Sequence, residues 1–238
     1  GVYNNGQDWR ISPRLTKAVT LPEHFRAGGY EAFGGGKIFH CLSWINDGYG
    51  KQQNEGKLWD RYWPAAGRPM PDPLWPKATG AKRASNGYLY SKPIAVGKSV
   101  EGRPPHFFDW APDPQPESKT ADHQVVDWAI GELMQRRPRP FFQAVGIFRP
   151  HIPWYAPEKY FALYPEDKVF LPKIKKDDLA DVPPAGHRGI RKAWHEWLVK
   201  NDEWRGAVHG YLASISFADA QVGRLLDALD KSSHAKDT

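Results

Sequence analysis

Residues 141–154 read Phe-Phe-Gln-Ala-Val-Gly-Ile-Phe-Arg-Pro-His-Ile-Pro-Trp, an apolar run of strand length that stops at a proline-bounded turn. Pro150 and Pro153 restrict the backbone on either side of His151. In α/β enzymes ligands bind beyond the carboxyl ends of the strands, where such a loop would lie. The pattern therefore predicts a short buried strand that presents His151 to a site; the alternative is a histidine packed within a loop.

Length and composition indicate a globular protein. The chain of 238 residues can bury one large core or two small ones, and 40% of its residues are hydrophobic. No apolar run reaches the length of a membrane span. The net charge of +6 is not clustered, so we expect a solvated basic surface and no nucleic acid partner. The single cysteine, Cys41, excludes an intrachain disulfide and a zinc site with several cysteines.

Both ends of the chain suggest a piece of a longer protein. The sequence opens on Gly1 without a methionine or a signal peptide, and residues 231–238 are polar where another strand would be expected.

The stretch from Thr20 to His40 combines a helix signal with a glycine triplet. Thr-Leu-Pro-Glu at residues 20–23 predicts a capped helix that ends near Arg26, followed by a short strand over residues 30–33. The three glycines after it would let the backbone approach a ligand closely, with Lys37 and His40 suited to an oxyanion. An ordinary turn explains the triplet equally well, and no nucleotide-loop pattern is present.

Residues 42–118 differ in character from the rest. Half of the chain's 22 prolines lie between Pro64 and Pro116, together with several tryptophans. We expect an irregular insertion packed by aromatic side chains and not a flexible linker. The tryptophans could form the wall of a substrate cleft, where their faces stack on sugar rings, or cover the core.

Helices and strands alternate in the second half of the chain, which is typical of an α/β fold. A helix is predicted from Thr120 to about Arg136, a second one after Pro157 and a third around Trp194 and Trp197. The first of them is expected to bury Val125, Val126, Ala129, Ile130 and Leu133.

The last helix shows the clearest periodicity. Its predicted buried stripe consists of Val208, Leu212, Ile215, Val222, Leu226 and Leu229. Asp219 is at the one position of that stripe that has no apolar residue. A buried acid needs a partner, so we interpret Asp219 as a structural hydrogen-bonding group, with a catalytic role as the alternative.

Several motifs together resemble the formylglycine-dependent sulfatases, on the iduronate-2-sulfatase-like branch. They are Tyr3-Asn-Asn5, Thr20-Leu-Pro-Glu-His-Phe25, Gly36-Lys-Ile-Phe-His40, Ala144-Val-Gly-Ile-Phe-Arg-Pro-His-Ile-Pro153 and Tyr211-Leu-Ala-Ser-Ile-Ser-Phe-Ala-Asp-Ala-Gln-Val-Gly-Arg-Leu-Leu226. The resemblance implies an alkaline-phosphatase-like α/β/α sandwich. Residues 1–238 would then be a partial sulfatase catalytic domain, its central part, with the insertion at about 42–118.

The same resemblance implies roles for three residues. Lys37 matches the lysine that holds the sulfate oxygens and the formylglycine, where its charge would stabilise a transition state. His40 matches the histidine that sits against the formylglycine hydroxyl. His151 matches the histidine that contacts the sulfate and the leaving-group oxygen, where it could donate a proton or a hydrogen bond. Lys37 and His151 are thus the predicted substrate-binding residues.

The chain also departs from the family pattern. Cys41 lacks the proline and arginine of the Cys-x-Pro-Ser-Arg motif, so it is not the expected nucleophile. The acid pairs that hold the metal in this family, usually calcium, are also absent, and we nominate no metal ligand. The formylglycine, made from a Cys or a Ser, and the calcium ligands would lie outside residues 1–238. The chain alone is therefore expected to be inactive.

The expected activity of the complete protein is hydrolysis of a sulfated sugar or another sulfate ester. Resemblance to exported sulfatases favours a periplasmic or secreted location. One alternative is a phosphodiesterase or phosphonate hydrolase of the same superfamily. Another is a non-catalytic carbohydrate-binding module, suggested by the 11 tryptophans.

Overall fold

The computed structural model describes residues 12–15, 17–38, 58–65, 110–187 and 192–238. The chain divides into two compact units. The first unit comprises residues 1–74, 116–148 and 218–238, and the second unit comprises residues 75–115 and 149–217. Each unit is considered by itself.

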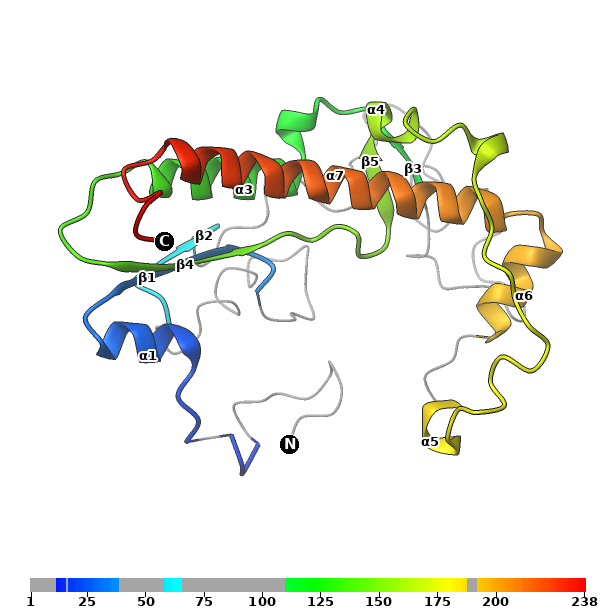
Figure 1. Cartoon of the computed structure of the whole chain (residues 1–238), viewed down its shortest axis with the longest axis horizontal. Helices are drawn as coiled ribbons and strands as arrows, with labels where there is room; N and C mark the ends of the chain where they lie inside the picture. Colours follow the sequence, from blue (N-terminus) through cyan, green and yellow to red (C-terminus); the bar gives the residue numbers. More distant parts are fainter. Residues whose placement is uncertain (1–11, 16, 39–57, 66–109, 188–191) are drawn as a thin grey trace. The chain divides into compact units, whose positions relative to one another are not determined.

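The first unit is built on a parallel sheet with the strand order β2 (Arg61–Trp63), β1 (Glu31–Gly36) and β4 (Phe141–Gly146). Helix α1 (Leu21–Ala27) packs on one face of this sheet and helix α3 (Ala121–Leu133) on the other (Figure 1). The α/β prediction is therefore confirmed, and within this unit the layers are helix, sheet and helix. Strand β4 confirms the strand predicted from Phe141 up to the proline-bounded turn, although its residues are half-buried and not fully buried.

Aromatic rings fill both faces of this sheet. On the α1 side, Phe25 stacks on Phe142 with 4.5 Å between ring centroids. On the α3 side, Phe33 meets Trp128 edge to face at 6.4 Å. Because successive residues of a strand point to opposite faces, β1 supplies both layers with core residues.

The two helices begin where their caps predict. Thr20 and Glu23 form a reciprocal capping box, in which the Glu23 carboxylate accepts from the Thr20 N–H at 2.9 Å. The Thr120 hydroxyl oxygen accepts from the His123 N–H at 3.4 Å at the start of α3. Helix α3 buries four of its five predicted core residues, Val125, Val126, Ala129 and Leu133.

The glycine triplet has a different role from either one expected. It lies inside β1, which extends through Gly36, and not in a ligand-binding or ordinary turn. A Cβ at Gly34 would come within 2.8 Å of the Ile38 side chain, and one at Gly35 within 2.7 Å of the Trp128 ring. Gly34 and Gly35 are therefore needed because neighbouring side chains occupy the space beside them that a ligand was expected to fill.

The second unit contains the parallel pair β3 (Trp110–Asp113) and β5 (Trp154–Pro157), in which Trp110 is opposite Trp154. Its helices are α4 (Glu158–Phe161), α5 (Pro184–His187), α6 (Lys192–Lys200) and the first half of α7 (Trp204–Lys231). The helices predicted after Pro157 and around Trp194 are confirmed.

Parts of the proline- and tryptophan-rich stretch at 42–118 are regular. Strands β2 and β3 both fall inside it, so the prediction of irregular structure is wrong for those segments, while residues 42–57 and 66–109 lie outside the described residues. Trp59 is buried and stacks on Phe142, as the core-covering alternative required.

Helix α7 buries a different face from the predicted stripe. Ile215, Val222 and Leu226 are 38%, 43% and 54% exposed, and Asp219 is exposed too. The buried positions are mostly small or polar, namely Ala207, Gly210, Ala213, Ser214, Phe217, Gln221 and Ala228.

Small residues are buried there because a bulky neighbour needs the space. Trp110 packs so closely on α7 that a Cβ at Gly210 would lie 2.4 Å from the Trp110 Cβ and 3.1 Å from its ring. A count of large apolar residues misses such a face. The interpretation of Asp219 as a buried hydrogen-bonding group is wrong, since an exposed carboxylate needs no protein partner.

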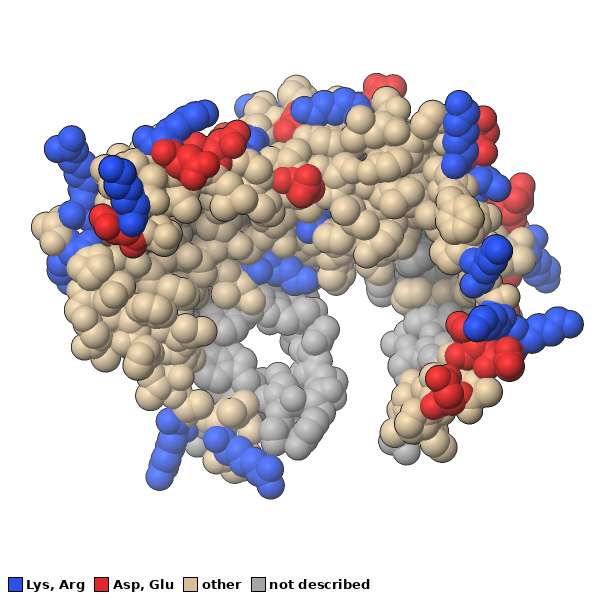
Figure 2. Space-filling model, in the orientation of Figure 1, with Lys and Arg blue, Asp and Glu red and all other residues tan. Residues whose placement is uncertain are grey.

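Charged side chains on the face seen in Figure 2 are interspersed, with basic groups beside acidic ones. Within the described residues, no helix combines the length and the apolarity that crossing a membrane requires.

Candidate active site

Lys37 lies directly beyond the carboxyl end of β1, where the sheet brings it beside the end of β4. The two strands pair in register from Glu31 opposite Phe141 to Gly36 opposite Gly146, and the Lys37 N–H donates to the Gly146 carbonyl at 2.8 Å. Lys37 is half-buried, and its ammonium nitrogen is 5.0 Å from the centre of the Phe148 ring. The lysine is thus placed at the sheet edge where α/β enzymes bind ligands.

Two glycines allow this placement. Gly36 has a φ of 75°, which favours glycine. A Cβ on Gly146 would lie 2.2 Å from the carbonyl carbon and oxygen of Lys37, so the two backbones can meet only if that side chain is absent. Main-chain contacts therefore fix the position of the Lys37 backbone.

His151 lies in the second unit, on the exposed turn between Arg149 and β5. Its Nδ1 is 2.6 Å from the Ile152 carbonyl oxygen. A carbonyl oxygen only accepts, so Nδ1 is the donor in this contact. The prediction of a histidine presented on a proline-bounded turn is confirmed, while its catalytic role stays a prediction.

Side chains hold this turn closed. The Arg149 guanidinium is buried and donates through Nε to the Tyr155 carbonyl at 2.7 Å. The Trp154 indole N–H donates to the Pro150 carbonyl at 2.8 Å. Sequence reasoning quoted Arg149 and Trp154 with the motif but assigned them no role, although a long donor on each side of His151 was a usable signal.

The buried carboxyl group of Asp113, on β3, interacts with the charge of Arg149. Burial raises the pKa of Asp113, and the Gln115 backbone N–H, at 3.0 Å, and the charge of Arg149 offset only part of that rise. Sequence reasoning missed Asp113 because it lies among the prolines of the stretch at 42–118.

The three predicted site residues are not brought together within one unit. Lys37 belongs to the first unit and His151 to the second, and His40 lies outside the described residues together with Cys41. Their grouping around one substrate stays a prediction.

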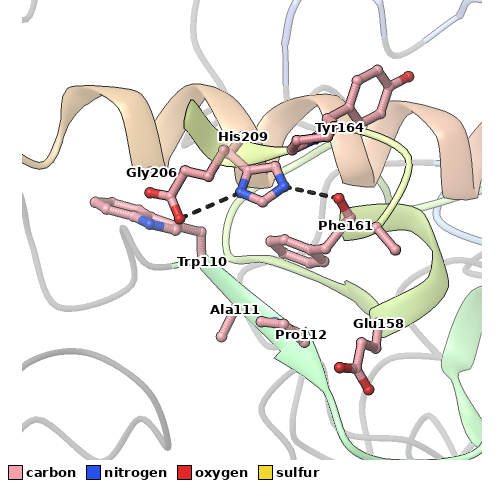
Figure 3. Close-up of a pocket in the computed structure, with 11 residues that line it drawn as sticks. Trp110, Ala111, Pro112, Glu158, Phe161, Tyr164, Gly206 and His209 are labelled. Atoms are coloured by element: carbon pink, nitrogen blue, oxygen red, sulfur yellow. Dashed lines mark hydrogen bonds and ion pairs between the residues drawn. The ribbon is translucent and has the colours of Figure 1, made fainter. Parts of the chain in front are cut away.

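A separate cavity of about 400 Å³ lies within the second unit (Figure 3). Trp110, Phe161 and His209 line it. His209 Nε2 is 2.9 Å from the Phe161 carbonyl oxygen, and Nδ1 faces the Glu166 carboxylate at 3.9 Å. Lys37 and His151, the predicted site residues that the structure describes, do not line this cavity.

Among the residues that the structure describes, no group of three or more His, Cys, Asp or Glu side chains could hold a metal ion. The described residues therefore do not fit a calcium site.

Three known proteins show how the chain compares with proteins of determined sequence or structure. A sulfatase described from Formosa agariphila is 32% identical over 250 residues, covering 100% of this chain and 44% of that protein. Human iduronate 2-sulfatase is 26% identical over 251 residues, covering 96% of this chain and 40% of that protein. A solved phosphonate monoester hydrolase of Agrobacterium radiobacter superposes with a TM-score of 0.46 at 18% identity, covering 89% of this chain and 44% of that one.

The chain thus spans less than half of the length of the relatives it matches. A family model described as Sulfatase matches residues 1–238, the whole of the chain. The chain therefore belongs to the sulfatase family.

Proposed function

We propose that the protein containing this chain hydrolyses sulfate esters, with a sulfated sugar or a related sulfated small molecule as its substrate. The family match over residues 1–238 carries this proposal. The position of Lys37 at the carboxyl edge of the sheet supports it, because a half-buried ammonium group there can bind an oxyanion.

Lys37 would pair with the sulfate oxygens and so stabilise the negative charge that is crowded around sulfur in the transition state. In its imidazolium form, His151 would give the Nε2 proton to the leaving alkoxide and keep the Nδ1 proton, which it donates to the Ile152 carbonyl. His40 is proposed beside the nucleophile on the strength of the motif alone.

Sulfatases generally use a divalent metal and a formylglycine nucleophile, which supply charge neutralisation and attack on sulfur. We propose both for the complete protein, with calcium as the metal. The described residues do not fit a calcium site, so the ligands of this metal are proposed to lie outside them.

The test is hydrolysis of an aryl sulfate and a sulfated sugar by the full-length protein and its Lys37→Ala and His151→Ala variants. Each variant is expected to lower kcat/KM by about 10²–10³ while its thermal unfolding stays like that of the parent, since one preorganised charge-stabilising group is lost. Activity within a few-fold of the parent would contradict the assignment. A parent that cleaves a phosphodiester or a phosphonate better than any sulfate ester would favour the hydrolase alternative.

We also propose a periplasmic or secreted location for the complete protein. Fractionation of the source cells with an antibody against this chain checks it, and a purely cytoplasmic signal would contradict the proposal.

A further inference from the structure

The ammonium group of Lys37 is held over an aromatic face. Lys37 Nζ lies 5.0 Å from the centre of the Phe148 ring. A cation at this distance is attracted by the negative face of the ring, and the attraction grows when water is excluded. Phe148 is only 7% exposed, so its ring is shielded from water. The contact therefore restricts a side chain that is otherwise long and flexible.

A buried carboxylate fixes the residue that carries this ring. The Phe148 N–H donates to Asp122 Oδ1 at 2.7 Å, and Asp122 is 4% exposed. Asp122 lies in the first turn of α3, two residues after the capping Thr120. A negative charge is favoured at this end of a helix. Helix α3 thus anchors the first residues beyond β4.

Three elements of the first unit meet in this contact. Lys37 follows β1, Phe148 follows β4 and Asp122 belongs to α3. The main-chain bond from the Lys37 N–H to the Gly146 carbonyl fixes the base of the lysine, and the ring restricts its tip. A charge that is already in place when an anion arrives needs little reorganisation to stabilise it.

We propose that Phe148 is a positioning residue for Lys37, and that Asp122 positions Phe148. This inference rests on the proposed function, because it concerns the same anion. Phe148 acts through the lysine and does not itself contact the sulfate ester. Removal of its ring leaves the Lys37 charge present but less well placed, so sulfate binds more weakly and turnover falls.

The experiment uses the full-length protein, with an aryl sulfate as substrate and inorganic sulfate as a competitive inhibitor. Phe148→Leu is expected to weaken inhibition by sulfate and to lower kcat/KM about tenfold, because the aromatic face is lost. Phe148→Tyr keeps the face and is expected to stay within about twofold of the parent. Asp122→Ala should shift both quantities in the same direction as Phe148→Leu.

A double-mutant cycle separates positioning from a general structural role. In a Lys37→Met background, Phe148→Leu is expected to change kcat/KM by less than about twofold, since residues that act through each other are not additive. If Phe148→Leu lowers kcat/KM by the same factor in both backgrounds, the proposal is overturned. It is also overturned if Phe148→Leu is as active as the parent.

Tyr160 provides a matched control. It is likewise 7% exposed, and the Lys159 ammonium lies 4.9 Å from the centre of its ring. Tyr160→Leu is expected to lower the thermal midpoint but to leave inhibition by sulfate unchanged. A loss of sulfate inhibition equal to that of Phe148→Leu would overturn the proposal. Parent-like activity of Lys37→Met would instead overturn the proposed function, and the positioning proposal with it.

Discussion

Lys37 and His151 are held in place by opposite means. At Lys37 two glycines let the ends of β1 and β4 touch, and the main chain fixes the residue. At His151 the turn is exposed, and the side chains of Arg149 and Trp154 close it by donating to backbone carbonyls. The first arrangement requires the absence of a side chain and the second requires particular donors. Different substitutions should therefore disrupt the two regions.

The largest effect is expected where a side chain must be absent. Gly146→Ala would place a methyl group 2.2 Å from Lys37 backbone atoms, and backbone cannot give way as a flexible side chain can. We expect a loss of about 3 kcal/mol or more in the free energy of unfolding, measured by denaturant titration of the full-length protein.

Gly131→Ala is the matched control for that substitution. Gly131 lies in α3, and nothing is found within 4 Å of the position its Cβ would occupy. This variant is expected to gain about 0.4–1 kcal/mol, because alanine restricts the unfolded chain and suits a helix. Equal effects of the two alanines would show that the contact at Gly146 does not matter.

The sequence predicted the features that depend on local chemistry. Thr20 and Thr120 cap their helices, and the apolar run before His151 is a strand followed by an exposed turn. Features that depend on a distant partner were not predictable. The glycines of β1 face Trp128 and Ile38, and α7 buries Gly210 because Trp110 packs there. The periodicity of large apolar residues depends only on the residues of the helix itself. It therefore cannot show that a bulky side chain of another element packs against a face of small residues.

At the His151 turn, the expected effect is smaller and follows from a lost donor. Trp154→Phe keeps an aromatic ring but removes the indole N–H that donates to the Pro150 carbonyl. We expect a loss of about 0.5–1.5 kcal/mol in the free energy of unfolding and a several-fold drop in kcat for sulfate ester hydrolysis. Tyr211→Phe, which keeps the ring that packs on Trp154, is the control and should leave kcat unchanged. A kcat for Trp154→Phe equal to that of the parent would show that this bond does not position His151.

The two units also differ in how a carboxyl group responds to pH. Burial raises the pKa of Asp113 in the second unit. Its protonated form therefore stabilises the fold below the unfolded-state pKa of about 3.9, and that contribution is lost as the pH rises through the folded-state pKa. Asp113→Asn, which does not titrate, should gain stability relative to the parent between pH 4 and pH 7. Equilibrium unfolding at both pH values measures the difference.

Glu31 in the first unit should show the reverse trend. Burial raises the pKa of Glu31, but hydrogen bonds from Arg137 and Arg139 and the charges of Arg137 and Arg61 outweigh it, and the net pKa is lowered. Ionised Glu31 therefore stabilises the fold above its unfolded-state pKa, and this stability is lost as the pH falls through the folded-state pKa. The cost of Glu31→Gln should be greater at pH 7 than in acid. The same pH trend in both variants would contradict the opposite pKa directions.

The smallest effect is expected for Asp219 on α7, which belongs neither to the surroundings of Lys37 nor to the His151 turn. Asp219 is exposed, so Asp219→Ala should change the free energy of unfolding by less than about 0.5 kcal/mol and leave turnover unchanged. Gln221, two residues further along the helix, is fully buried; it donates to Glu117 at 3.0 Å and accepts from Arg224 at 2.7 Å. Gln221→Ala removes both of these hydrogen bonds and should cost about 1–3 kcal/mol, since each is typically worth about 0.5–1.5 kcal/mol. Thermal and denaturant unfolding of the two variants side by side is the measurement. If Asp219→Ala proved the more destabilising of the two, the buried face of α7 would be the apolar stripe and not the face of small residues that packs against Trp110.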